Sequence, residues 1–149
     1  MSLDVEVQVV TDAASLPQTS QLSDWAQLAY LQNDAASLVI RIVDSSESRE
    51  LNRQYRHKDS PTNVLSFPFD APSFVTDKHL GDLVICASVV AQEAMQQNKS
   101  LEHHWAHLVI HGMLHLQGYD HIEEQQAYLM ESKEIALLAK LNINNPYEA

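Results

Sequence analysis

The sequence is poor in residues that cross-link or punctuate a chain. Its 149 residues include one cysteine, three glycines and five prolines. The lone Cys86 excludes an internal disulfide framework, and so little Gly and Pro excludes a low-complexity chain. No apolar run approaches the roughly 18 residues that suggest a membrane span, and the opening MSLDVEVQVV lacks the basic and apolar regions of a secretion signal. We therefore expect a cytoplasmic protein.

Basic residues are also scarce. Nine Lys and Arg stand against 20 Asp and Glu, which gives a formal net charge of -11. A protein that binds nucleic acid through its bulk charge carries an excess of Lys and Arg, because its affinity comes largely from counterion release. A nucleic-acid role here must use a local cluster. Four of the nine basic residues lie close together in the sequence: Arg49, Arg53, Arg56 and Lys58.

The remaining composition, 45% hydrophobic and 19% charged, is that of a globular protein, and the length predicts one domain over residues 1–149. Alternating apolar residues predict strands around residues 5–9, 38–42, 64–69 and 83–86. Helical spacing predicts helices around residues 22–29 and 123–141, and helix-forming composition with local start and end signals predicts helices around residues 45–56, 88–97 and 101–116. The order βαβαββααα, with helices gathered after an early mixed run of strands, predicts the α+β class with a small mixed sheet.

Several local signals refine these elements. Asp44 and Glu47 predict a variant of the capping box at the start of the second helix. Ser100 and Gly118 predict the start and the end of the fourth helix. The last helix is predicted from the helical spacing of three residues, Leu129, Ala136 and Lys140.

The strand at residues 64–69 is predicted at an edge of the sheet or lining a cleft, since Pro68 cannot donate to a strand ladder. Phe67 and Phe69 share one face of this strand, and we expect both in the core. An exposed pair of rings beside Arg56 would instead suit the bases of single-stranded nucleic acid. Gly81 predicts a bulge or a close approach of two backbones.

Six of the eight histidines lie between His103 and His121, and three of them have the spacing of a metal site. His111 and His115 lie one turn apart on a predicted helix, which suits adjacent corners of a tetrahedral zinc ion. Gly118 allows the chain to turn so that His121 supplies a third corner. Three protein ligands and one open position are typical of a catalytic zinc site, so we favour this interpretation over unrelated surface or core histidines.

The same spacing occurs in the metzincin proteases, H-E-x-x-H-x-x-G-x-x-H, with one difference. Gly112 stands where those proteases carry the glutamate that activates the zinc-bound water. Peptide hydrolysis by that route is therefore disfavoured. His107 continues the histidine stripe, and we expect it to pack or hydrogen-bond beside the site. Asp120 either orients a ligand imidazole or caps the last helix, and the sequence does not choose between these roles.

Arg49, Arg53 and Arg56 share one side of the second helix. Such a stripe could contact phosphate, because the guanidinium fork fits phosphate oxygens. The interpretation that we favour from the residues alone is a solvated face paired with acidic neighbours, which are Glu47, Glu50 and Asp59. Arg56 is the strongest candidate for an exception, since it lies at the helix end, just before the loop.

The motif H-G-x-L-H-L-x-G-Y-D-H at residues 111–121 resembles the signature of the YbeY family of endoribonucleases, the rRNA maturation factors. Two further blocks are similar to the family in the same order: L-N-x-x-Y-R-x-K-D-x-P-T-N-V-L-S-F-P at residues 51–68 and L-G-D at residues 80–82. The resemblance implies a metzincin-like zinc site with one Zn²⁺ per chain held by His111, His115 and His121. It also implies that Arg56 is important for RNA cleavage, and it says nothing of Arg49 or Arg53.

The resemblance further implies a single-strand-specific endoribonuclease that acts in 16S rRNA 3′-end maturation and ribosome quality control. Ribosomal proteins of the small subunit and a ribosome-assembly GTPase are the implied partners, with no membrane and no DNA. Docking through protein contacts would compensate for the weak attraction between this acidic chain and RNA, because it raises the local RNA concentration. Two alternatives stay open: an assembly factor with a mainly structural zinc, and a metzincin-like hydrolase of another substrate. The general base is unassigned.

Overall fold

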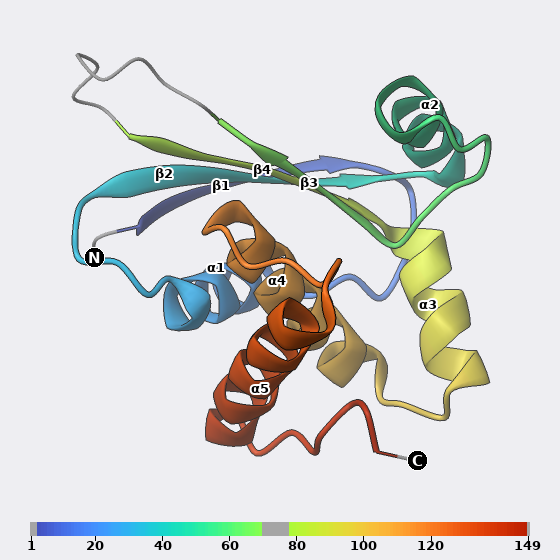
Figure 1. The fold of residues 1–149 in the computed structure, drawn as a ribbon. Coiled ribbons are helices and arrows are strands. Elements are labelled where there is room, and N and C mark those ends of the chain that lie inside the picture. Colours follow the sequence, from blue (N-terminus) through green and yellow to red (C-terminus); the bar gives the residue numbers. More distant parts are fainter. Residues whose placement is uncertain (1–2, 70–77, 149) are drawn as a thin grey trace.

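A computed structural model of the chain describes residues 3–69 and 78–148, and within them it contains one four-stranded sheet and five helices (Figure 1). In chain order the elements are β1 (Leu3–Val10), α1 (Thr19–Ala29), β2 (Ala36–Val43), α2 (Ser45–Arg56), β3 (Val64–Pro68), β4 (His79–Cys86), α3 (Ala87–Gln96), α4 (Leu101–Leu116) and α5 (Glu124–Lys140). The predicted α+β class and order of elements are confirmed. None of the helices in the described ranges combines the length and apolar composition that crossing a bilayer requires.

The sheet is mixed, with the strand order β1-β2-β4-β3. β1, β2 and β4 are mutually parallel, and β3 runs antiparallel to β4. β3 is therefore an edge strand, as Pro68 predicts, because an edge position leaves the missing N–H without a strand to bond. This edge of the sheet faces the histidine-bearing end of α4.

The main core lies between the sheet and α1 and α4, which cover one face, while α2 lies on the other face (Figure 1). Trp105 of α4 is 1% exposed, and the fully buried strand residues Ile40 and Leu83 belong to the same apolar cluster. A smaller apolar cluster under α2 contains Leu65 and Val84. Because α4 is buried by both the sheet and α5, its histidines are held on a rigid element.

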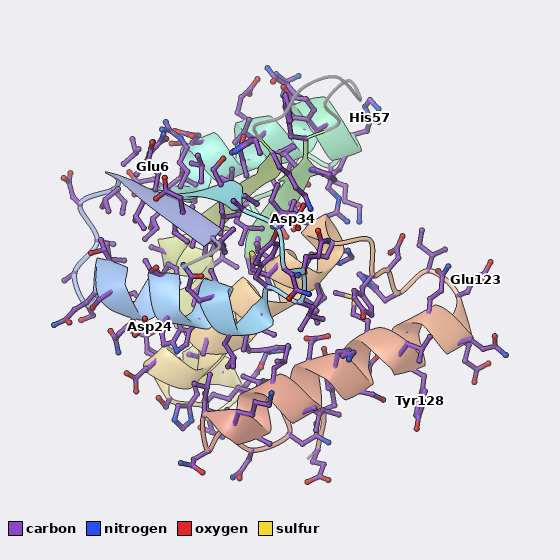
Figure 2. The ribbon with its side chains drawn as sticks, turned by 90° about the vertical axis from the view of Figure 1, so that its left-hand side faces the viewer. Glu6, Asp24, Asp34, His57, Glu123 and Tyr128 are labelled. Atoms are coloured by element: carbon purple, nitrogen blue, oxygen red, sulfur yellow. The ribbon has the colours of Figure 1, made fainter. Side chains whose placement is uncertain are left out.

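The last helix is present as predicted, but it buries a different face. Its buried residues are Met130, Glu134, Leu137 and Leu138, whereas the three residues that predicted the helix, Leu129, Ala136 and Lys140, are exposed. Figure 2 shows the side chain of Tyr128 pointing away from the body of the molecule near the start of this helix. Helical spacing predicted the helix correctly, but packing against α4 buries a face that lies one position further along the sequence.

Two local predictions are wrong. Asp44 occupies the N-cap position of α2, but it makes no side-chain cap, because its carboxylate accepts a hydrogen bond from Thr11. Glu47 pairs with Arg41 of β2 at 2.6 Å instead of closing the capping box. Phe69 is 53% exposed and lies outside the core, although Phe67 packs against the cluster under α2.

Gly81 meets both expectations that the sequence raised. The parallel register between β2 and β4 shifts next to it, between Ser37 and Leu38. Its φ is +151°, and a Cβ at this position would lie 2.5 Å from the carbonyl oxygen of Phe67. The close approach of the backbones of β3 and β4 therefore requires glycine here.

Candidate metal centre

His111 and His115 project from the same side of α4 near its C-terminal end. Their ring centroids lie 4.7 Å apart, as expected for residues one helical turn apart. Ser100 starts this helix as predicted, and its hydroxyl accepts a hydrogen bond from the backbone N–H of His103 at 3.3 Å. The helix thus supplies two of the three predicted ligands from one rigid surface.

The turn after α4 brings the third histidine back to the first two. Gly118 has φ +100° and donates its N–H to the carbonyl of His115 at 3.0 Å, while Tyr119 donates to Leu114 at 3.0 Å. These two bonds form a Schellman motif, which reverses the chain after a glycine in the left-handed region. The ring of His121 then lies 5.0 Å from that of His115 and 5.6 Å from that of His111.

This set of donors fits a metal ion such as zinc. One ring nitrogen from each of His111, His115 and His121 lies within 4.8 Å of the other two. Burial lowers the pKa of His115, and the neighbouring rings of His111 and His121 lower it further. The neutral imidazole that results is the form with a lone pair for a metal ion.

Gly112 leaves no room for the glutamate that zinc proteases carry at this position. A Cβ here would lie 2.7 Å from Cδ2 of Leu83 in β4 and 3.4 Å from the hydroxyl of Ser66 in β3. Leu83 is fully buried, so its side chain has little space to move. The close packing of α4 on the sheet therefore disfavours any side chain at this position.

Arg56 opens onto the same pocket as the three histidines. The pocket has a volume of about 560 Å³ and is lined by α2, β3, α4 and the turn before α5; Arg56, His111, His115 and His121 all contribute to it. Arg56 is exposed and has no ion-pair partner within the two described ranges. Its guanidinium group is thus available to an anion in the pocket.

Two buried polar residues of α2, which the sequence reasoning missed, hold the loop that follows Arg56. The hydroxyl of Ser48 donates to the carbonyl of Thr62 and accepts from its N–H, both at 3.0 Å. The amide of Asn52 donates to the carbonyl of Ser60 at 2.8 Å. Both side chains are 2% exposed. Buried polar residues on an otherwise polar helix carry no clear sequence signal, because their burial depends on the loop folding over them.

The other two arginines of the stripe behave as the favoured interpretation predicts. Arg49 pairs with Asp59 at 2.6 Å, and Arg53 pairs with Glu50 at 2.5 Å. Neither arginine lines the histidine pocket. Of the three arginines of the stripe, Arg56 therefore lines the pocket, whereas Arg49 and Arg53 form ion pairs outside it.

Asp120 does not cap the last helix, whose N-cap residue is Glu123. Its carboxylate accepts the backbone N–H of His121 at 2.7 Å, and it lies 4.0 Å from Nδ1 of that ring. Asp120 thus hydrogen-bonds to the main-chain N–H of His121 and not to its imidazole ring.

His107 hydrogen-bonds beside the site, as expected, and its partner is a residue that the sequence reasoning missed. Nε2 of His107 lies 2.6 Å from Oε1 of Glu134 in α5, and Nδ1 of His111 lies 3.2 Å from the same oxygen. Burial raises the pKa of Glu134, but the hydrogen bonds from the two histidines outweigh it, and the net pKa is about 2. Glu134 is therefore a buried carboxyl group whose hydrogen bonds favour its ionised form. Its signal in the sequence is a charged residue within the apolar stripe of Met130, Leu137 and Leu138.

Comparison with known proteins shows the family of this chain. A sequence model of the family described as Endoribonuclease YbeY matches residues 6–142, which is most of the chain. The chain belongs to the YbeY endoribonuclease family. Two curated YbeY endoribonucleases from Pseudomonas putida, strains F1 and KT2440, are each 56% identical to it over 147 residues, which cover 97% of this chain and 93% of the relative.

A solved structure shares the YbeY-family fold of this chain at low sequence identity. The solution structure of TM1509 from Thermotoga maritima superposes with a TM-score of 0.56, covers 96% of both chains and is 22% identical. This likeness supports the α+β architecture independently of the sequence motifs. The predicted resemblance to the YbeY family is confirmed.

Proposed function

We propose that this YbeY-family protein is a zinc-dependent endoribonuclease specific for single-stranded RNA, acting in 16S rRNA 3′-end maturation and ribosome quality control. One Zn²⁺ per chain would be held by His111, His115 and His121, and Arg56 would act on the scissile phosphate. The observation that carries the proposal is the convergence of three imidazoles and an exposed arginine on one pocket of about 560 Å³. Membership of the family supports the endoribonuclease role.

The histidines and the arginine of the pocket would have different roles in RNA cleavage. When bound, the zinc ion would supply Lewis-acid polarisation of a water or a phosphoryl oxygen. Arg56 offers a fixed positive fork, which stabilises the charge that gathers on the phosphate during cleavage. Residue 112 has no side chain to accept a proton. The proton that the glutamate of zinc proteases would take from the attacking water must therefore pass to another group: a second water, the 2′-hydroxyl of the substrate or a loop residue.

The residues that line the pocket favour an unpaired RNA strand as the substrate. The ring of Tyr55 is 62% exposed, lines the pocket beside Arg56 and packs edge-on against Phe67 with ring centroids 5.1 Å apart. An exposed ring next to a cation suits an unstacked base, because base and ring stack face to face while the cation meets the phosphate. The paired bases of a duplex do not expose their faces in this way.

The proposed setting is the cytoplasm, with the ribosomal small subunit and its assembly proteins as partners. The net charge of -11 gives RNA no general attraction to the surface. Docking through ribosomal proteins or an assembly GTPase would hold the RNA near Arg56 at a high local concentration.

The test is cleavage of an end-labelled single-stranded RNA by purified wild-type protein and by His111→Ala, Arg56→Ala and Arg53→Ala prepared in parallel. We expect His111→Ala and Arg56→Ala to lose cleavage while their circular dichroism matches the wild type. Arg53→Ala is the matched control, because it removes an arginine of the same helix that is paired with Glu50 and lies outside the pocket. Equal activity in all four preparations would indicate a contaminating nuclease and would refute the proposal.

A second candidate function is a ribosome-assembly factor in which the zinc is mainly structural, which the acidic surface favours. It predicts that variants of the histidines lose stability and ribosome association together, without a cleavage activity to lose. A metzincin-like peptide hydrolase is the weaker alternative, since Gly112 leaves no space for the usual glutamate. Hydrolysis of an unstructured peptide by the pure protein would support it.

A further inference from the structure

The carboxylate of Glu134 connects one metal-site histidine to the last helix and to the C-terminal segment. Its side chain is 1% exposed. Oε1 lies 3.2 Å from Nδ1 of His111, 2.6 Å from Nε2 of His107 and 2.8 Å from the hydroxyl of Tyr147. A single buried oxygen of α5 thus contacts two histidines of α4 and the hydroxyl of Tyr147 in the segment after α5.

The direction of these hydrogen bonds determines which nitrogen of His111 carries the proton. Oε1 of Glu134 accepts the hydroxyl hydrogen of Tyr147 and so acts as an acceptor in this cluster, which makes Nδ1 of His111 the donor. In the neutral ring the lone pair is then on Nε2, which is the nitrogen left for a metal ion. The opposite tautomer would place two lone pairs against each other at 3.2 Å inside the protein.

The carboxylate is itself fixed by its surroundings. Glu134 lies on α5 among the buried residues Met130, Leu137 and Leu138. The hydroxyl of Tyr147 donates to it, and the Tyr147 ring packs edge-on against His107 with centroids 5.6 Å apart. A ligand held by such a rigid partner loses little orientational freedom when it binds a metal ion.

We propose that Glu134 is a positioning residue of the metal centre: it accepts the Nδ1–H of His111 and so keeps Nε2 of this ring directed to the ion. His107 and Tyr147 hold the carboxylate in place, and the C-terminal segment thereby becomes part of the centre. The inference rests on the metal centre proposed above and adds to it the group that orients one ligand.

His107, His111 and Glu134 also form a group whose donor atoms lie close together, as those of a second metal site would. The distances favour hydrogen bonding. Two ligand atoms of one tetrahedral zinc lie about 3.3 Å apart, given bond lengths near 2 Å. His107 and Glu134 are 2.6 Å apart, which is the length of a strong charge-assisted hydrogen bond.

The experiment compares the wild type with Glu134→Gln, Tyr147→Phe and the control Glu131→Gln. Glu131→Gln removes the same charge from the same helix one turn away, where no hydrogen bond to a histidine ring is found among the described residues. Zinc affinity is measured by competition with a chromophoric chelator, and the bound equivalents are counted. The tautomer of His111 is read from nitrogen-15 chemical shifts of the metal-free proteins.

We expect the wild type to bind one equivalent of zinc and to hold His111 in the Nδ1–H tautomer. Glu134→Gln should bind zinc about 10- to 100-fold more weakly, which is the usual effect of losing a partner of a ligand histidine. It should also lose the tautomer preference. Tyr147→Phe should weaken binding by a smaller factor, and Glu131→Gln should match the wild type.

Each contrary result has its own meaning. Wild-type affinity and tautomer in Glu134→Gln would overturn the positioning role while leaving the three-histidine centre in place. A second zinc equivalent that Glu134→Gln alone loses would replace positioning by a second metal site. No zinc binding by the wild type would remove the metal centre and this inference with it. If Glu134→Gln does not fold, unchanged affinity in Tyr147→Phe overturns the proposal.

Discussion

Replacing Gly112 tests whether packing explains the missing glutamate. At an ordinary helix interior, Gly→Ala stabilises a protein by about 1 kcal/mol. Here the new Cβ would lie 2.7 Å from Cδ2 and 3.3 Å from Cδ1 of Leu83, which is fully buried. Overpacking of this kind costs about 1–3 kcal/mol. We therefore expect Gly112→Ala to lower the free energy of unfolding by about 1 kcal/mol.

The assay is urea unfolding followed by circular dichroism in the presence of a chelator, so that metal binding does not contribute to stability. Leu83→Val provides the matched background, because it removes the two δ-carbons that the new Cβ would meet. In that background Gly112→Ala should cost less than in the wild type by about 1 kcal/mol, as expected for residues in direct contact. Stabilisation by Gly112→Ala, with effects that add across the two backgrounds, would refute the reasoning.

The corresponding Gly112→Glu variant addresses the chemistry directly. It would bury an unpaired carboxylate between α4 and the sheet, at a cost of about 3 kcal/mol or more. We expect it to unfold more easily than Gly112→Ala and to gain no peptidase activity. A stable Gly112→Glu protein that hydrolyses peptides would show that packing does not exclude the zinc-protease mechanism.

Three further predictions concern other parts of the chain. Gly81→Ala should lower stability by about 2 kcal/mol or more in urea unfolding, since its Cβ would meet the backbone oxygen of Phe67 at 2.5 Å; a neutral effect would contradict the close approach. Tyr55→Ala should weaken single-stranded RNA binding about tenfold or more in a fluorescence titration, and unchanged affinity would remove Tyr55 from the RNA site. Burial lowers the pKa of His104 below 6.5, although Glu93 opposes the shift; the stability that neutral His104 contributes is therefore present above that pH and is lost as the pH falls. The free energy of unfolding should therefore decline less steeply between pH 7 and 5 in His104→Asn than in the wild type. Equal slopes for the two proteins would contradict this role of His104.

The parts of the fold that follow from local patterns could be predicted. Helical and alternating spacing, together with local signals for helix starts and ends, located all the helices and strands of the described ranges, because each of these signals depends on one element alone. Ser100, Pro68 and Gly118 marked a helix start, an edge strand and a turn through steric and hydrogen-bonding properties that are largely independent of the surroundings. The pairing of His111 with His115 follows from the same helical geometry.

What failed depends on partners from distant parts of the chain. Asp44 could not be assigned as a cap because Thr11, far away in sequence, competes for its carboxylate. The buried stripe of α5 depends on how it meets α4, so Glu134 was missed although it contacts His111. Phe69 was expected in the core from strand alternation, and its N–H does continue the pairing with β4 by bonding to the carbonyl of Leu80. Its ring is nevertheless 53% exposed, because at this end of the strands it packs edge-on against His79 and not under α2.

The most direct test of the central claim is a zinc titration of chelator-stripped protein, in which cleavage of a labelled single-stranded RNA is followed at each addition. The account predicts that wild-type activity rises with zinc and levels off at one equivalent per chain. His121→Ala, which removes the ligand that the Gly118 turn brings back to α4, should show no rise at any ratio. Cleavage that does not depend on zinc, or an identical titration curve for His121→Ala, would contradict the assignment of this histidine pocket as the site of RNA cleavage.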